Sequence, residues 1–394
     1  MLENFRWHLY TDFVFGKDAE KNIGKELKRL GATKVLVMHD SGKFLYDTGL
    51  LEAIKGYIAA EGMEVFEMGG VLPNPRLSLV RKGVELCKKE GIDFLVAIGG
   101  GSTIDTCKAV GMGAVYDGDV WELVENPGTA KAMLPVAVVL TYPATGSESG
   151  TGAVISNDDH EKKIKRSVGG PFGRPVISFE NPELTYTLPK YLTACGVCDM
   201  WVHILERYFS TTAPGVMDYM CAGLLRALLD FGPKVIADPD NYENRAEIMW
   251  IGTLAHNDTC GVGRAQDWAT HGLGHEMGAL FDTPHGATLT IVGPSWMKYV
   301  YKDNLPRFAR FARNVFGITE EDDEKAAIAG IEATKDFYKR MGLPTSFEEA
   351  GLPEDEEGLK HMADQAAAIS NNALGCMKAL TAEDNLAIYK MSLK

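Results

Sequence analysis

The sequence predicts an α/β N-terminal half built on a parallel sheet, followed by an all-α C-terminal half. Three observations lead to this prediction: short, continuously apolar runs in the first half, amphipathic stretches between them, and the loss of such runs beyond about residue 188. Apolar strands that alternate with helices are typical of a parallel sheet covered on both faces. We expect two domains, 1–185 and 186–394, with the Pro- and Gly-rich stretch 169–189 as their junction.

The individual elements follow from the period of the apolar residues. Four apolar runs predict strands at 35–38, 65–68, 94–98 and 136–140. Amphipathic windows between them predict helices at 49–61 and 77–90. In the second half only helical windows are found, at 191–209, 216–231, 242–257, 322–341 and 356–374.

The composition excludes several classes of protein. Of 394 residues, 45% are apolar and 24% are charged, as in ordinary globular proteins. A net charge of −14 argues against a nucleic acid or an anionic membrane as a partner. There is no apolar run of about 18 residues that could span a membrane, and the N-terminus does not resemble a secretory signal. Seven cysteines without a repeating spacing fit reduced thiols, so we expect a cytoplasmic protein.

Two glycine-rich loops follow predicted strands. The stretch GGGSTID (99–105) opens a helix, where glycines let the backbone approach a ligand and the first N–H groups favour a phosphate. Ser102 and Asp105 also fit an S-x-x-D capping box, so part of this pattern is structural. The stretch LTYPATGSESGTG (140–152) is a second polar loop of this kind. Loops that follow neighbouring parallel strands lie at the ligand-binding edge of the sheet, so the pair favours a nucleotide site.

The second half contains a cluster of histidines. Asp199 and His203 lie four residues apart in CDMWVHILE, and His271 and His275 have the same spacing and are followed by His285. Residues four apart share one face of a helix, so two separate segments each offer a pair of ligands. One carboxylate with several imidazoles suits a divalent first-row metal, whereas any of these residues alone would indicate a core or surface side chain.

Other histidines and cysteines receive a structural interpretation. His256 and His361 have no companion in the sequence, and we do not assign them to a site. Cys195 and Cys198 form a single C-x-x-C inside a helical window, where packing is favoured over metal or redox chemistry.

Taken together, these motifs resemble a known family. In this order, GGGSTIDTCK, LTYPATGSES, TLPKYLTACGVCDMWVHILE and HGLGHEMGALFDTPHG are similar to the iron-containing (group III) alcohol dehydrogenases, in particular to the butanol dehydrogenase and broad aldehyde reductase branch. The similarity covers nearly the whole chain, about 11–393. It implies a dehydroquinate synthase-like architecture, in which a Rossmann-like dinucleotide-binding domain and an all-α metal-binding domain have the active site in the cleft between them.

The resemblance also implies a role for individual residues. Asp199, His203, His271 and His285 would hold one divalent metal ion, Fe²⁺ or Zn²⁺, and His275 would be catalytic, near the nicotinamide and outside the metal's ligands. The cofactor-binding residues would be Asp40, Asn74, Gly100, Gly101, Ser102, Asp105, Thr141, Thr145 and Lys163, with Lys162 or Lys165 as alternatives to Lys163.

The expected activity is a metal-dependent hydride transfer between NAD(P)(H) and small primary alcohols or aldehydes, such as butanol and butyraldehyde. Two alternatives stay open: a dehydroquinate-synthase- or glycerol-dehydrogenase-like enzyme on the same frame, and a non-catalytic metal- or nucleotide-binding protein. A lyase of the first kind needs basic residues for its polyanionic substrate, and few lie between 196 and 290. The resemblance also implies a homodimer, in which residues 13–15 could pair across a two-fold axis by strand addition.

The preferred cofactor depends on Asp40, which ends the first apolar run in VLVMHDSGKF. A carboxylate at this edge of the sheet can accept hydrogen bonds from the ribose hydroxyls and would repel a 2′-phosphate. We therefore expect NAD(H) to be preferred over NADP(H). The alternative is that Asp40 only caps the Ser41–Gly42 turn.

Overall fold

The computed structural model describes residues 2–126, 128–159 and 164–394. Lys162 and Lys163, which were considered above for the cofactor, lie outside the described residues.

The chain divides into two compact units, which we call the sheet unit and the helical unit. The sheet unit contains residues 8–188 and 240–253. The helical unit contains the N-terminal segment up to Trp7 together with 189–239 and 254–394.

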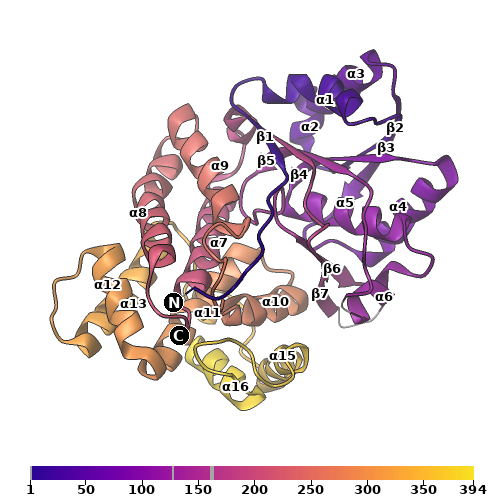
Figure 1. Ribbon diagram of the computed structural model, residues 1–394. Helices are drawn as coiled ribbons and strands as arrows, with labels where there is room; N and C mark the ends of the chain where they lie inside the picture. Colours follow the sequence, from indigo (N-terminus) through magenta and orange to yellow (C-terminus); the bar gives the residue numbers. More distant parts are fainter. Residues whose placement is uncertain (1, 127, 160–163) are drawn as a thin grey trace. The chain divides into compact units, whose positions relative to one another are not determined.

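The sheet unit is built on six parallel strands in the order β1-β8-β5-β4-β2-β3 (Figure 1). The four strands predicted from apolar runs are confirmed, and each extends beyond its run by up to three residues at one end or both. Their bounds, with those of the two remaining strands, are β1 Asp12–Phe15, β2 Lys34–Asp40, β3 Glu64–Val71, β4 Phe94–Gly100, β5 Val136–Tyr142 and β8 Ile177–Glu180.

Both faces of this sheet are covered, as the continuous apolar runs predict. Along β2, Leu36 and Met38 face one core, whereas Val35 and Val37 face a second core on the opposite side. Residues of α4, α5 and α6 belong to the first core, and residues of α1 and α3 to the second. The helices of this unit are η1 Ala19–Asn22, α1 Ile23–Arg29, α2 Lys43–Asp47, α3 Leu50–Ala60, α4 Leu77–Glu90, α5 Gly101–Ala114, α6 Val120–Glu125 and η2 Pro182–Thr185.

Two features of the sheet unit differ from the sequence prediction. The stretch 169–189, expected to be a junction, contains β8, a fully buried strand paired with β1 and β5. Four residues bounded by prolines are too few to give a periodic signal. A separate antiparallel pair, β6 (Gly152–Asn157) and β7 (Ile164–Gly169), was also not predicted.

The segment 240–253 completes the sheet unit although it follows two helices of the other unit in sequence. Trp250 packs edge-on against Phe13 of β1, with 5.4 Å between ring centroids. The hydroxyl of Thr253 donates to Oε1 of the buried Glu148 at 2.8 Å. The unit therefore depends on a contribution from later in the chain.

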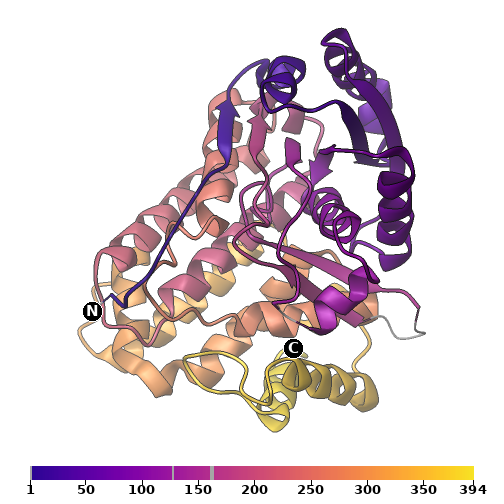
Figure 2. The same cartoon turned by 45° about the vertical axis from the view of Figure 1, so that its right-hand side comes forward.

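The second half is helical, as predicted, and its five predicted windows correspond to α7, α8, α9, α13 and α15. Helix α15 ends at Ile369, five residues before the end of its window. Helices α10 and α11 gave no amphipathic window, because most of their residues are buried and the period is weak; only the spacing of His271 and His275 indicated a helix at α10. The C-terminal helices α15 and α16 pack together (yellow in Figure 2). The bounds are α7 Lys190–Tyr208, α8 Val216–Ala237, α9 Tyr242–His256, α10 Ala269–Phe281, α11 His285–Val300, η3 Tyr301–Asn304, α12 Leu305–Phe316, α13 Asp323–Arg340, α14 Phe347–Ala350, α15 Glu356–Ile369 and α16 Ala382–Met391.

The composition led to two expectations, one on membrane-spanning segments and one on the cysteines. Among the described residues, no helix is both long enough and apolar enough to cross a membrane. The seven cysteines are free thiols, and only Cys376 is partly exposed.

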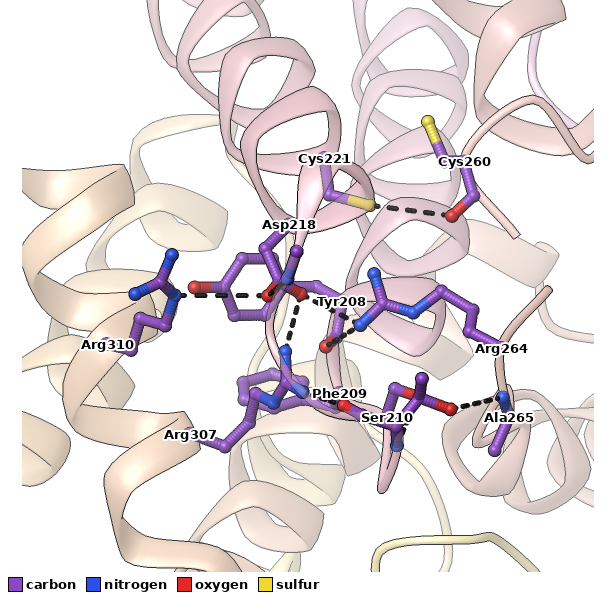
Figure 3. A network of polar contacts seen from close by, with 12 residues as sticks. Tyr208, Phe209, Ser210, Asp218, Cys221, Cys260, Arg264, Ala265, Arg307 and Arg310 are labelled. Carbon is purple, nitrogen blue, oxygen red and sulfur yellow. Dashed lines mark hydrogen bonds and ion pairs between the residues drawn. The ribbon is translucent and has the colours of Figure 1, made fainter. Parts of the chain in front are cut away.

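A buried carboxylate organises the start of α8 in the helical unit (Figure 3). Asp218 is fully buried, and its Oδ1 accepts hydrogen bonds from Arg307 at 2.5 Å and Arg264 at 2.8 Å. Its Oδ2 accepts from the backbone N–H of Gly215 at 2.9 Å and lies 3.9 Å from Nε of Arg310. Both bonded arginines are themselves buried, so their charges depend on this one carboxylate.

We expect Asp218→Asn to lower the free energy of unfolding by about 3–5 kcal/mol, because it leaves two buried guanidinium groups without a counter-charge. Urea unfolding followed by circular dichroism measures the loss. Asp230→Asn on the same helix is the control: its carboxylate is 59% exposed and forms an ion pair with the exposed Lys234, so less than about 1 kcal/mol should be lost. Equal stabilities of the two variants would contradict the prediction.

Candidate functional site

Helix α7 places Asp199 and His203 on one face, as their spacing predicts. The helix is buried along nearly its whole length, and both side chains are less than 5% exposed. Oδ1 of Asp199 lies 3.2 Å from Nδ1 of His203. Burial, together with the nearby His271, lowers the pKa of His203 well below its usual value, which keeps this imidazole neutral and able to act as a ligand.

Helices α10 and α11 bring two further imidazoles to the same carboxylate. Oδ1 of Asp199 is 3.5 Å from Nε2 of His271 and 3.8 Å from Nε2 of His285. The ligand atoms of these three residues all lie within 4.8 Å of one another. Asp199 and two histidines more than 70 positions later thus converge on a volume that one metal ion could occupy.

His203 and His275 flank this three-residue group. The ring of His203 lies 4.3 Å from that of His271, measured between centroids, and its contact with the carboxylate completes a four-residue cluster. His275 is partly exposed and lies 6.0 Å from His271 and 5.1 Å from His285, again between ring centroids. It therefore lies beside the cluster.

Glu206 is a functional candidate that the sequence reasoning missed. Its carboxylate is completely buried and accepts two hydrogen bonds from His271, one from the ring Nδ1 and one, at 2.9 Å, from the backbone N–H. Burial lowers the pKa of His271, but the charges and hydrogen bonds of Glu206 and Asp199 together outweigh burial and raise it to about 9. The available signal was its position on the same face of α7 as Asp199 and His203.

His256, to which the sequence assigns no role, lies beside the cluster. This residue is not isolated: its ring lies 4.3 Å from that of His203, between centroids, and its Nδ1 is 3.0 Å from Nη2 of Arg207. The residue ends α9 and reaches the cluster from a helix far away in sequence, so no spacing pattern could reveal it.

The first glycine-rich loop has the geometry of a phosphate cradle. Helix α5 begins at Gly101, directly after β4, with Gly100 as its N-cap and no side-chain capping hydrogen bond. The capping box predicted for Ser102 and Asp105 is therefore wrong. A Cβ at Gly101 would lie 2.5 Å from the side chain of Thr145, so only glycine allows the second loop to come this close.

A side chain of α5 forms hydrogen bonds with the second loop and the strand that follows it. Asp105 is buried, and its carboxylate accepts from the hydroxyl of Ser147 at 2.5 Å and from the backbone N–H of Val154 at 2.8 Å. Thr141 is buried at the end of β5, and Thr145 is partly exposed. Thr145 also accepts from the N–H of Ser147 at 3.3 Å.

Asn74 lies in a loop after β3 and Asp40 at the end of β2. The backbone of Asn74 is left-handed, with φ of 57°, and its Oδ1 accepts from the ammonium of Lys165 at 3.0 Å. Asp40 ends β2 and is partly exposed, and its Oδ1 accepts from the N–H of Gly42 at 2.7 Å. The carboxylate thus caps the turn with one of its oxygens.

Comparisons with known proteins identify the family of the chain. The model of iron-containing alcohol dehydrogenases matches residues 11–182, and the C-terminal model of the same family matches residues 193–393. The probable NADH-dependent butanol dehydrogenase 1 of Bacillus subtilis (strain 168) is 38% identical over 100% of both chains. The NADPH-dependent aldehyde reductase of Escherichia coli (strain K12) is 35% identical over 89% of this chain and 90% of its own.

A solved structure extends the similarity to the fold. The crystal structure of NADH-dependent butanol dehydrogenase A from Thermotoga maritima superposes with a TM-score of 0.95, at 37% identity, over 100% of this chain and 99% of that one. The matched family models together cover nearly all of the sequence. The chain therefore belongs to the iron-containing alcohol dehydrogenase family.

Proposed function

We propose that the protein transfers hydride between a nicotinamide cofactor and small primary alcohols or aldehydes, with butyraldehyde as a test substrate, at a divalent metal. As a member of its family, the protein is an NAD(P)-dependent oxidoreductase of alcohols and aldehydes. The observation that carries the proposal is the convergence of Asp199, His271 and His285 from three helices.

We assign Asp199, His203, His271 and His285 as the metal ligands. One carboxylate oxygen with three imidazole nitrogens suits Fe²⁺ and Zn²⁺ alike. The buried Nε2 of His271 makes no hydrogen bond to any described residue, and such an atom fits a metal ligand better than a core side chain. When bound, the metal supplies the Lewis acidity that polarises the oxygen of the substrate.

The remaining polar residues of the cluster have supporting roles. The ring N–H of His271 that donates to Glu206 is at Nδ1, which leaves the lone pair of Nε2 for the metal. His275 lies beside the ligands and is partly exposed, so it can move a proton between the substrate oxygen and water. Imidazole suits this role because it titrates near neutral pH.

We assign the nucleotide to the loops of the sheet unit. The backbone N–H groups of Gly101 and Ser102 at the start of α5 would bind the pyrophosphate, aided by the helix dipole. Thr141 and Thr145 would contact the cofactor from the second loop. Asn74 would contact it as well, and Lys165, its bonded partner, is our choice of lysine in place of Lys163.

We further propose that NADH is preferred over NADPH because of Asp40. One carboxylate oxygen binds the N–H of Gly42, which fixes the side chain at the end of β2 and leaves it partly exposed. At about 4 Å and an effective dielectric constant near 20, two like charges repel by about 4 kcal/mol before solvent and salt reduce this value. A third of that repulsion gives about tenfold discrimination against a 2′-phosphate.

The two alternatives receive no support. The relatives described above are named as a butanol dehydrogenase and an aldehyde reductase, and none of them is named as a lyase or as a non-catalytic binding protein. The convergence of Asp199, His271 and His285, with His203 in contact with the same carboxylate, supports an active metal site.

We expect His271→Ala to lose most of its bound metal and most of its turnover, because removal of one of four ligands leaves the other three poorly held. The matched control is His275→Ala, one turn further along α10, which should keep its metal while kcat falls roughly tenfold to a thousandfold. Elemental analysis beside butyraldehyde reduction measures both effects. Full metal occupancy in His271→Ala, or metal loss in His275→Ala, would contradict the assignment.

Asp40→Gly should move the ratio of kcat/KM for NADH and NADPH toward NADPH by about tenfold, because the charge that repels the 2′-phosphate is gone. Initial rates with each cofactor at fixed ionic strength give this ratio. A wild-type enzyme that already prefers NADPH would show that the carboxylate does not face the ribose.

We expect a homodimer in solution. Strand β1 is at the edge of the sheet and can accept a strand from a second copy. Light scattering should give a mass near twice the 43.0 kDa of one chain. A mass of one chain at micromolar concentration would rule out the dimer.

A further inference from the structure

Lys108 is a buried lysine to which the proposed reaction gives no role. It lies on α5, two turns after the glycines of the first loop, and its side chain is completely inaccessible to solvent. Its ammonium group donates to the backbone carbonyls of Gly150 and Gly152, both at 2.9 Å. These carbonyls belong to the end of the second glycine-rich loop.

The same helix holds that loop at a second point. Asp105, one turn before Lys108, accepts from the hydroxyl of Ser147 and from the backbone N–H of Val154. The ammonium of Lys108 thus binds acceptors of this loop, and the carboxylate of Asp105, one turn earlier, binds donors of the loop and of the strand after it. The guanidinium of Arg174 donates to the carbonyl of Ser149 and adds a third charged contact.

The loop held in this way lies against the first turn of α5. A Cβ at Gly101 would collide with the side chain of Thr145, so Thr145 and the helix start are in direct contact. Helix α5 therefore supplies the N–H groups proposed for the pyrophosphate and, two turns later, the side chains that hold the other cofactor loop.

Stability alone explains this lysine poorly. Burial lowers the pKa of Lys108 to about 8, against the opposing charge of Asp105, so the ammonium is desolvated at a cost. Apolar groups of similar volume often replace buried charges without loss of stability. What an apolar side chain cannot do is bind two carbonyls and thereby set the path of the loop.

We propose that Lys108 is a positioning residue for the nicotinamide cofactor: it holds the loop of Thr145 in register with the pyrophosphate-binding turn of α5. The proposal rests on the assignment of the nucleotide to these loops. It requires that loss of the ammonium weaken nucleotide binding while the metal cluster, which belongs to the other unit, keeps its ion.

The test is Lys108→Met in the full-length, metal-loaded enzyme. The dissociation constant for NADH, measured by fluorescence titration, should rise about tenfold, as expected for loss of a charge-assisted hydrogen bond. Metal content and kcat at saturating NADH should stay near the wild-type values. Without nucleotide, the amides of Ser149 and Gly150 should exchange hydrogen for deuterium faster than in the wild type. The matched control is Lys89→Met on α4, whose side chain is 73% exposed.

A milder variant keeps the test decisive if Lys108→Met does not fold. Ser147→Ala removes only the hydroxyl that donates to Asp105 and should also raise the dissociation constant for NADH without metal loss. Wild-type affinity and wild-type loop exchange in a folded Lys108→Met would overturn the proposal, as would metal loss in parallel with the loss of affinity. A wild-type enzyme that binds neither NADH nor NADPH would overturn the nucleotide assignment itself and this proposal with it.

Discussion

The two hydrogen bonds between Glu206 and His271 are the interaction on which the arrangement of the metal cluster depends. A single buried carboxylate holds both the backbone and the ring of the histidine, so the position of α10 and the rotation of the imidazole are set together. A ligand that must stay within a few tenths of an ångström of its metal needs such a support. Asp199, His203 and Glu206 all come from α7, which is rigid because it is buried on nearly every side. One helix therefore provides two of the proposed ligands and also orients a proposed ligand on another helix.

In the sheet unit, too, one helix serves both purposes: it offers groups to a ligand and holds a neighbouring segment in place. Helix α5 has no side-chain cap, so its first N–H groups are available to a ligand, and its second and third turns carry the charges that hold the neighbouring loop. Both units thus place a buried charged group behind the residues that would contact the cofactor or the metal. Such groups are costly to bury, and they fix geometry more firmly than apolar packing does.

The sequence predicted the elements that have a clear period and the residues that have a motif. The central strands are continuous apolar runs, and Asp199, His203 and the later histidines could be grouped by spacing and by resemblance. Contacts between distant positions are harder to predict. The spacing puts Glu206 on the face of Asp199 and His203 but does not show that it contacts His271, 65 residues later, and no spacing connects His256 with the cluster. The capping box failed because the helix starts two residues earlier than the pattern requires, which frees Asp105 for Ser147. Strand β8 escaped notice because four residues are too short for a period.

The late segment of the sheet unit affects how the protein is made. On the ribosome, residues 8–188 emerge first, but Trp250 and Thr253 follow only after α7 and α8 have been synthesised. At about 5–20 residues per second, this is a delay on the order of seconds to tens of seconds. During that time Phe13 lacks its ring contact with Trp250, and Glu148 lacks the hydrogen bond from the hydroxyl of Thr253. Until then the sheet unit lacks the contacts of Trp250 and Thr253, and a chaperone would be of most use in this interval.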